Sequence, residues 1–179
     1  MAMSAQPAQA TRTVRTRSRA ETVAVGALIA PLLLAGDVVI LSGELGAGKT
    51  AMSTGLIAAL GSADQVTSPT FTIMRHHQLA RGGEVLHLDA YRLSGPDDAE
   101  DIGLLELLDG GAIAIIEWGE RIAAALGPDL LVVALRHVDD AAGAAGTTAA
   151  DAADDDWREI HIEGVGPRWA DVDLSAVKP

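Results

Sequence analysis

Residues 38–50, VVILSGELGAGKT, join an apolar run to a glycine-rich turn that ends in Lys49 and Thr50. The run contains only Val, Ile and Leu, which is typical of a parallel strand covered on both faces. Residues 50–60 follow the turn with the composition and period of a helix. The pattern G-x-x-x-x-G-K-[ST] between a strand and a helix predicts a P-loop.

The turn has the properties that bound phosphate groups require. Its glycines let the backbone curl, so that several N–H groups point at phosphate oxygens near the positive end of the following helix. Lys49 adds a point charge at the β- and γ-phosphates, and the Thr50 hydroxyl can ligate Mg²⁺. The sequence therefore predicts a site for ATP and Mg²⁺ formed by Gly43, Glu44, Leu45, Gly46, Ala47, Gly48, Lys49 and Thr50.

The rest of the chain alternates between strand and helix periods. This alternation predicts an α/β fold, a three-layer domain of the P-loop NTPase type whose mostly parallel central sheet is flanked by helices. Strands are expected at residues 11–16, 38–41, 72–78, 84–89, 112–116, 130–135 and 158–162. Helices are expected from a capping box at 18–21 towards residue 31 or 34, and at 50–60, 97–108, 120–126 and 168–172.

Length and composition predict one domain at residues 11–179, preceded by a flexible tail at 1–10. Six aspartates, half of the net charge of −12, lie in a low-complexity stretch at 138–156, which predicts an acidic loop.

The chain contains no cysteine, which excludes a disulfide framework. Its apolar runs fall short of the ~20 residues that cross a bilayer, and the first 20 residues lack a secretory apolar stretch. We therefore expect a cytoplasmic protein without membrane contact.

Two strand-end carboxylates are candidates for holding the metal ion and its water shell. Glu117 follows the apolar run 113–116, and Asp89 ends the strand expected at 84–89. Ligands of open parallel sheets bind at the carboxyl edge, where both acids are expected. Sequence periodicity does not choose between them. Ser68 and Thr70 lie after the P-loop helix, where P-loop proteins commonly place a segment that senses the γ-phosphate.

Four segments, ELGAGKT at 44–50, SPTF at 68–71, HLDAYR at 87–92 and EW at 117–118, follow one another along the chain. Their order and spacing resemble those of the bacterial TsaE (YjeE) family over residues 18–135. The resemblance is specific because the last three segments are not general P-loop features. They also use scarce residues, since the chain has one Phe, one Tyr and three Trp.

The resemblance implies a role in making N6-threonylcarbamoyladenosine at position 37 of ANN-decoding tRNAs. The family's ATPase associates with the TsaB and TsaD subunits, and its hydrolysis of ATP supports repeated turnover, so contact with tRNA is indirect. By this resemblance Thr50 and Glu117 bind Mg²⁺, and Asp89 is a functionally required carboxylate. Lys49, Asp89 and Glu117 form the catalytic set, with Ser68 and Thr70 in the nucleotide-responsive switch.

The sequence leaves other possibilities open. A weak ATPase activated by partners is favoured, but a small-molecule kinase or a nucleotide-gated assembly module is compatible with a P-loop. A kinase predicts an arginine-rich lid, yet Arg121 and Arg136 are the only arginines in residues 97–156.

For the adenine base, Trp157 or Arg158 could form one wall of the pocket and residues 18–22 the other. Packing roles fit His87, Tyr91 and Arg92 as well as ligand contact does.

Overall fold

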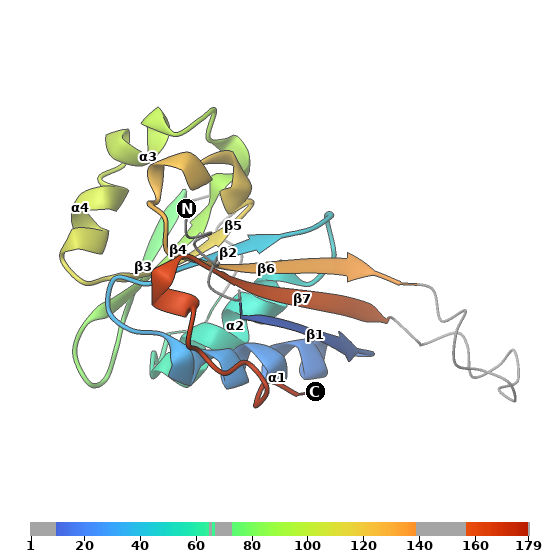
Figure 1. The fold of residues 1–179 in the computed structure, drawn as a ribbon. Coiled ribbons are helices and arrows are strands. Elements are labelled where there is room, and N and C mark those ends of the chain that lie inside the picture. The colour runs from blue at the N-terminus through green and yellow to red at the C-terminus, as the bar shows by residue number, and fades with distance from the viewer. Residues whose placement is uncertain (1–9, 65, 67–72, 139–156, 179) are drawn as a thin grey trace, which may run out of the picture.

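The computed structural model describes residues 10–64, 66, 73–138 and 157–178, which form an α/β fold on a seven-stranded sheet of order β1-β7-β6-β2-β5-β4-β3 (Figure 1). The strands are β1 (Thr11–Thr16), β2 (Val38–Ser42), β3 (Met74–Gln78), β4 (Glu84–Asp89), β5 (Ile113–Glu117), β6 (Leu130–His137) and β7 (Arg158–Val165). β6, β2, β5 and β4 are parallel, and antiparallel strands extend both edges. The expected mostly parallel centre is confirmed.

Helices cover both faces of this sheet, which gives the expected three layers (Figure 1). In β2, Val39 and Leu41 face a core that includes residues of α1 (Arg19–Ile29) and α2 (Lys49–Leu60). Val38 and Ile40 face the opposite core, which includes residues of α3 (Asp97–Asp101) and α4 (Leu104–Asp109). Because side chains alternate along a strand, an entirely apolar strand has to be covered on both sides.

The capping box at the start of α1 is present with one change. Ser18 Oγ accepts a hydrogen bond from the Glu21 backbone N–H at 3.1 Å. The Glu21 carboxylate accepts from the N–H of Arg17 at 2.8 Å, one residue before the cap. Helix α1 ends at Ile29 and continues as the 3₁₀ turn η1 (Ala30–Leu32), which contains the proline near which the helix was expected to end.

Three of the expected helices were wrong in form. The segment expected as one helix at 97–108 is divided into α3 and α4 by Gly103, whose φ of 71° is incompatible with a continuous right-handed helix. Residues 120–126 fall in the 3₁₀ turns η3 (Gly119–Arg121) and η4 (Ala123–Ala125), and 168–172 in and after η6 (Pro167–Trp169). A single 3₁₀ turn also brings residues i and i+3 to one side of the chain. A short segment can therefore show this spacing without forming an α-helix.

The expected strands lie in place, and β1 and β4 have the expected bounds. β6 and β7 are longer than expected because they pair antiparallel with each other along their whole length. Residue 72 of the expected third strand lies outside the described residues. So do residues 1–9 of the expected tail and 139–156 of the expected acidic loop.

Two glycines let α1 and α2 approach each other until their backbones touch. A Cβ atom built on Gly55 of α2 would lie 2.0 Å from the carbonyl oxygen of Val23. One built on Gly26 of α1 would lie 2.5 Å from the carbonyl oxygen of Met52. Since α2 begins at the P-loop lysine, this contact also fixes where the P-loop helix lies on the sheet.

We predict that Gly55→Ala destabilises the protein by about 1–3 kcal/mol, because the added methyl group overlaps a carbonyl that belongs to a packed helix. Helix propensity alone would have the opposite sign, since Ala is favoured over Gly by about 1 kcal/mol in a helix. Chemical denaturation measures the change. Gly95→Ala is the control, because nothing lies within 4 Å of a Cβ built there. Equal or greater stability of Gly55→Ala would contradict the proposed contact.

Candidate functional site

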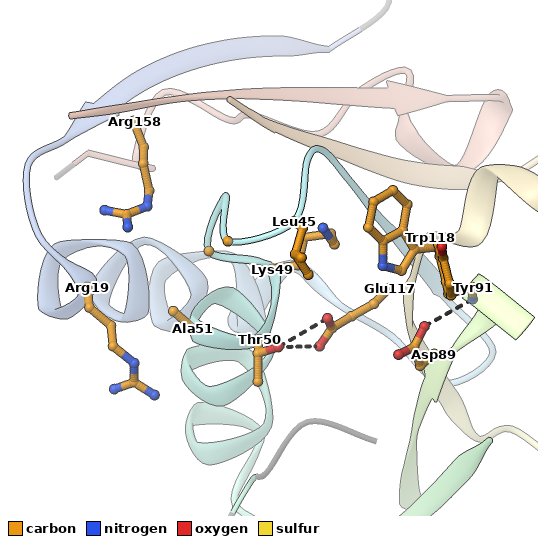
Figure 2. Close-up of a pocket in the computed structure, with 12 residues that line it drawn as sticks. Arg19, Leu45, Lys49, Thr50, Ala51, Asp89, Tyr91, Glu117, Trp118 and Arg158 are labelled. Carbon is orange, nitrogen blue, oxygen red and sulfur yellow. Dashed lines mark hydrogen bonds between the residues drawn. The ribbon is translucent and has the colours of Figure 1, made fainter. Parts of the chain in front are cut away.

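A cavity of about 600 Å³ lies beside the P-loop at the carboxyl ends of β4 and β5 (Figure 2). It is the place where ligands of open parallel sheets bind. Its lining combines P-loop residues with acids, aromatic rings and two arginines: Arg19, Leu45, Gly46, Gly48, Lys49, Thr50, Ala51, Asp89, Tyr91, Glu117, Trp118 and Arg158. Sequence segments that are far apart therefore contribute to one cavity.

The P-loop backbone depends on glycine at two of its positions. Gly48 is the N-cap of α2 and has a φ of 106°, in the left-handed region that side chains disfavour. A Cβ atom on Gly43 would lie 2.1 Å from the carbonyl oxygen of Leu135 in β6. Gly48 turns the chain into α2, and Gly43 lets the loop lie directly against the sheet.

Lys49 is only 5% exposed and is held inside the loop. Its Nζ donates hydrogen bonds to the carbonyl oxygens of Gly43 at 2.7 Å and Glu44 at 2.8 Å. It also lies 3.9 Å from the centre of the Trp118 ring, within the range of a cation–π contact. Burial lowers the pKa of Lys49 below its ordinary value, and nearby carboxylates, first among them Glu117, oppose that shift.

Glu117 lies under the first turn of α2 and is 4% exposed. The Thr50 hydroxyl donates to its two carboxylate oxygens at 3.0 and 3.1 Å (Figure 2). Ser53, one helical turn further, shares its hydroxyl proton between the Lys49 carbonyl oxygen at 3.2 Å and Oε1 at 3.4 Å. β5 pairs with β2, and Leu41 of β2 is the register partner of Glu117. The strand that leads into the P-loop is therefore the neighbour of the strand that ends in this acid.

Asp89 is the register partner of Glu117 on the other side, but β4 lies one strand further from β2. Its Oδ1 accepts a hydrogen bond from the Tyr91 backbone N–H at 3.0 Å. This bond caps the 3₁₀ turn η2 (Ala90–Arg92). Of the two candidate acids, Glu117 thus contacts Thr50, whereas Asp89 lines the cavity and holds η2.

Two aromatic rings form the wall of the cavity near Asp89. Trp118 has a φ of 60° and is the only non-glycine residue with a positive φ in the described part of the chain. Its ring packs at 58° on that of Tyr91, with centroids 5.4 Å apart, and the Arg121 guanidinium lies 5.1 Å from the Tyr91 centroid. Tyr91 is nevertheless 57% exposed, so this wall is also part of the surface.

At the opposite side of the P-loop, Arg19 of α1 and Arg158 of β7 line the cavity (Figure 2). Arg19 lies within residues 18–22, the segment that the sequence predicts as one wall of the adenine-binding pocket. Trp157, the alternative to Arg158, is not among the lining residues. Ser68 and Thr70 lie outside the described residues.

Two contacts of Glu117 were not predicted from the sequence. One is the bond from Ser53, whose position three residues after Thr50 places both hydroxyls on one side of α2. The other comes from His87, which is fully buried and whose Nε2 lies 3.0 Å from Glu117 Oε1. A histidine two residues before Asp89 lies on the same face of β4, but its partner depends on which strand is adjacent.

The donor set of the site fits Mg²⁺. Thr50 and Glu117 offer hard oxygen atoms, the type of ligand that Mg²⁺ prefers. Within residues 10–64, 66, 73–138 and 157–178, no group of three or more His, Cys, Asp or Glu side chains could hold a metal ion. Mg²⁺ usually keeps several water molecules and takes only one or two carboxylates from a protein.

Comparison with known proteins identifies the family. The model of the family described as "Threonylcarbamoyl adenosine biosynthesis protein TsaE" matches residues 16–144. The chain belongs to the TsaE family. A TsaE protein of Streptomyces coelicolor is 43% identical over 155 residues, which cover 86% of this chain and 97% of that protein. The TsaE protein of Bacillus subtilis is 34% identical over 87% of both chains.

The fold of this TsaE chain is also similar to a solved structure. The crystal structure of Bacillus subtilis YdiB superposes with a TM-score of 0.69 and 28% sequence identity, covering 90% of both chains. The matched proteins from S. coelicolor and B. subtilis are named tRNA threonylcarbamoyladenosine biosynthesis proteins. Among its described residues, this TsaE chain has no helix that combines the length and the hydropathy of a membrane span.

A second buried histidine lies behind the site. His77 of β3 packs near His87 with ring centroids 6.2 Å apart, and its Nδ1 lies 3.6 Å from Asp64 Oδ2. Burial lowers the pKa of His77 below its ordinary value, and the adjacent His87 and Arg75 lower it further. The contact with Asp64 opposes the shift without cancelling it. His77 therefore favours its neutral form in the folded protein.

We predict that His77→Leu reduces the acid sensitivity of this protein. Because folding lowers the pKa of His77, the unfolded chain binds this proton more readily. The resulting contribution to stability is present above the ordinary histidine pKa of about 6.5 and is lost as the pH falls through it towards the folded pKa. Free energies of unfolding at pH 7.5 and 5.5 test this.

The quantity to compare is the loss of stability between these two pH values, which is expected to be smaller in His77→Leu than in the wild type. His76→Leu is the control, since His76 is the adjacent residue but has an exposed side chain paired with Glu84. An unchanged pH difference in His77→Leu would show that the imidazole of His77 does not titrate as described.

Proposed function

We propose that this chain is the ATP-binding and ATP-hydrolysing subunit required for N6-threonylcarbamoyladenosine modification of tRNA. Its hydrolysis of ATP is proposed to drive repeated turnover of a TsaB–TsaD complex in the cytoplasm. The observation that carries the proposal is the bond of Thr50 to Glu117 directly beneath a P-loop in a chain of the TsaE family. If Glu117 had no role in binding a metal ion, its burial beside Thr50 would be unusual, because burying the charge of a carboxylate is costly.

The P-loop amides and Lys49 would bind the phosphates. Lys49 already lies in the loop, and it would exchange the carbonyl oxygens of Gly43 and Glu44 for phosphate oxygens. Thr50 and Glu117 would hold Mg²⁺ from one side. When bound, this ion neutralises charge on the β- and γ-phosphates. Ser53 would keep the Glu117 carboxylate oriented while the Thr50 hydroxyl turns towards the ion.

Asp89 has the position expected of a group that orients the attacking water or couples the site to a partner. It lines the cavity at the same strand level as Glu117 and caps the turn that carries Tyr91. A change at Asp89 would move this exposed ring and, through it, Trp118. The short segment from Asp89 to Tyr91 would thus link the reaction site to the exposed surface that a partner protein can contact.

The first test concerns ATP binding. Lys49→Ala is expected to weaken ATP binding at least about tenfold, because a charge-assisted hydrogen bond is worth about 1.5–3 kcal/mol. Calorimetric titration measures the affinity. Lys178→Ala is a matched control, because Lys178 is the only other lysine and lies exposed near the C-terminus. Unchanged affinity of Lys49→Ala would remove the basis of the proposed function.

The second test separates hydrolysis from assembly. The protein is mixed with TsaB and TsaD, the complex is sized, and tRNA modification is followed with ATP, ADP or a non-hydrolysable ATP analogue. With ATP we expect repeated modification, whereas the analogue should allow about one round because release of the subunit needs hydrolysis.

The alternatives give different results in the same assay. If the analogue supported repeated modification as well as ATP does, the chain would be an assembly module in which hydrolysis is incidental. If a panel of metabolites instead accepted phosphate from ATP, the chain would be a small-molecule kinase. The proposed function predicts phosphate release alone.

A further inference from the structure

The third contact of Glu117 has no assigned purpose. His87 Nε2 lies 3.0 Å from Oε1, the oxygen that also accepts from Thr50 and Ser53. His87 has no exposed surface, so this imidazole is not available for direct contact with a partner. Among the described residues, its only polar contact is with the acid proposed to bind Mg²⁺.

The sheet explains why these two side chains meet. His87 and Asp89 lie on one face of β4, and Glu117 lies on the corresponding face of the adjacent β5. Since Asp89 is the register partner of Glu117, His87 is its diagonal neighbour, within reach of a long side chain. The next residue along that face of β5, Ile115, belongs to the core that α2 covers. The imidazole thus approaches Glu117 from the protein interior.

The hydrogen-bond chemistry defines the tautomer of His87. A carboxylate only accepts hydrogen bonds, so a bond between the two groups requires a proton on Nε2. The other ring nitrogen, Nδ1, is buried and has no hydrogen-bond partner among the described residues. No other group in the described part of the chain hydrogen-bonds to the ring, so the bond to the carboxylate fixes both its tautomer and its orientation.

We propose that His87 is a positioning residue for the metal site, which holds the Glu117 carboxylate so that its oxygens face Thr50. This inference rests on the proposed function, since it assigns Glu117 to Mg²⁺. Hydrogen bonds to the ligands of a metal ion typically change metal affinity or activity by about 10–100-fold. His87 would act on Mg²⁺ only through Glu117 and would leave the P-loop contacts with phosphate unchanged.

Two substitutions of similar polarity separate positioning from simple packing. The amide Nε2 of Gln can take the place of His Nε2, whereas the shorter Asn side chain ends near the position of His Nδ1. His87→Gln should therefore preserve the bond to Glu117, and His87→Asn should lose it. His76→Asn is the control for a polar change on the adjacent hairpin strand, because His76 faces Glu84 at the surface.

The first experiment measures ATP binding over a series of free Mg²⁺ concentrations and again in EDTA. For His87→Asn the Mg²⁺ midpoint should rise at least about tenfold while affinity in EDTA stays unchanged, and His87→Gln should recover most of the loss. An unchanged midpoint in His87→Asn, or an equal loss in both variants, would overturn the proposal. If the wild type failed to bind ATP at all, the proposed function would fail instead.

The second experiment needs no nucleotide or metal. Long-range ¹H–¹⁵N NMR correlations distinguish the two neutral tautomers of histidine, and the spectrum of His87→Gln identifies the signal of His87 among the five histidines. We expect the Nε2–H form in the wild type. A proton on Nδ1 alone would overturn the proposal, because Nε2 could then not donate to Glu117, whatever the outcome of the ATP titration.

Discussion

The pairing of β2 with β5 is the constraint on which the candidate site depends. β2 leads directly into the P-loop, and its register partner for Leu41 is Glu117. This places a carboxylate beneath Thr50 without any long loop, since both groups come from the ends of regular elements. The close contact of α1 with α2 at Gly26 and Gly55 then fixes the helix from which Thr50 projects. The proposed metal site would need such rigid supports on both sides.

The same constraint explains what the sequence could predict and what it could not. The P-loop and the layered fold follow from local patterns, and the same patterns mark both strand-end acids as candidates. Local patterns do not distinguish Asp89 from Glu117, because each residue lies at the end of a strand. In the sheet they also lie at the same level, as register partners. Only the strand order β2-β5-β4 distinguishes them, and that order is a property of the whole sheet. The family resemblance favoured Glu117 before any geometry was known.

Other differences come from features that sequence periodicity does not contain. Gly103 divides the segment 97–108 by adopting a left-handed conformation, although its neighbours have helical spacing. His87 contacts Glu117 diagonally across two strands, so the contact depends on register and not on spacing along the chain. Residues 119–121 and 123–125, after Trp118, each form a single 3₁₀ turn where the sequence predicts one helix. Each of these features needs tertiary structure to become visible.

Two buried charged residues of the site, Lys49 and Glu117, are hydrogen-bonded to groups of the protein itself. Lys49 donates to two P-loop carbonyls, and Glu117 has three hydrogen-bonding neighbours. A phosphate or a metal ion that entered the site would therefore replace the interactions of these two groups. The binding free energy is then the difference between two satisfied states, and small changes in the surrounding groups alter it. This is the physical reason why the role proposed for His87, a buried group away from the cavity lining, would alter the affinity of the site.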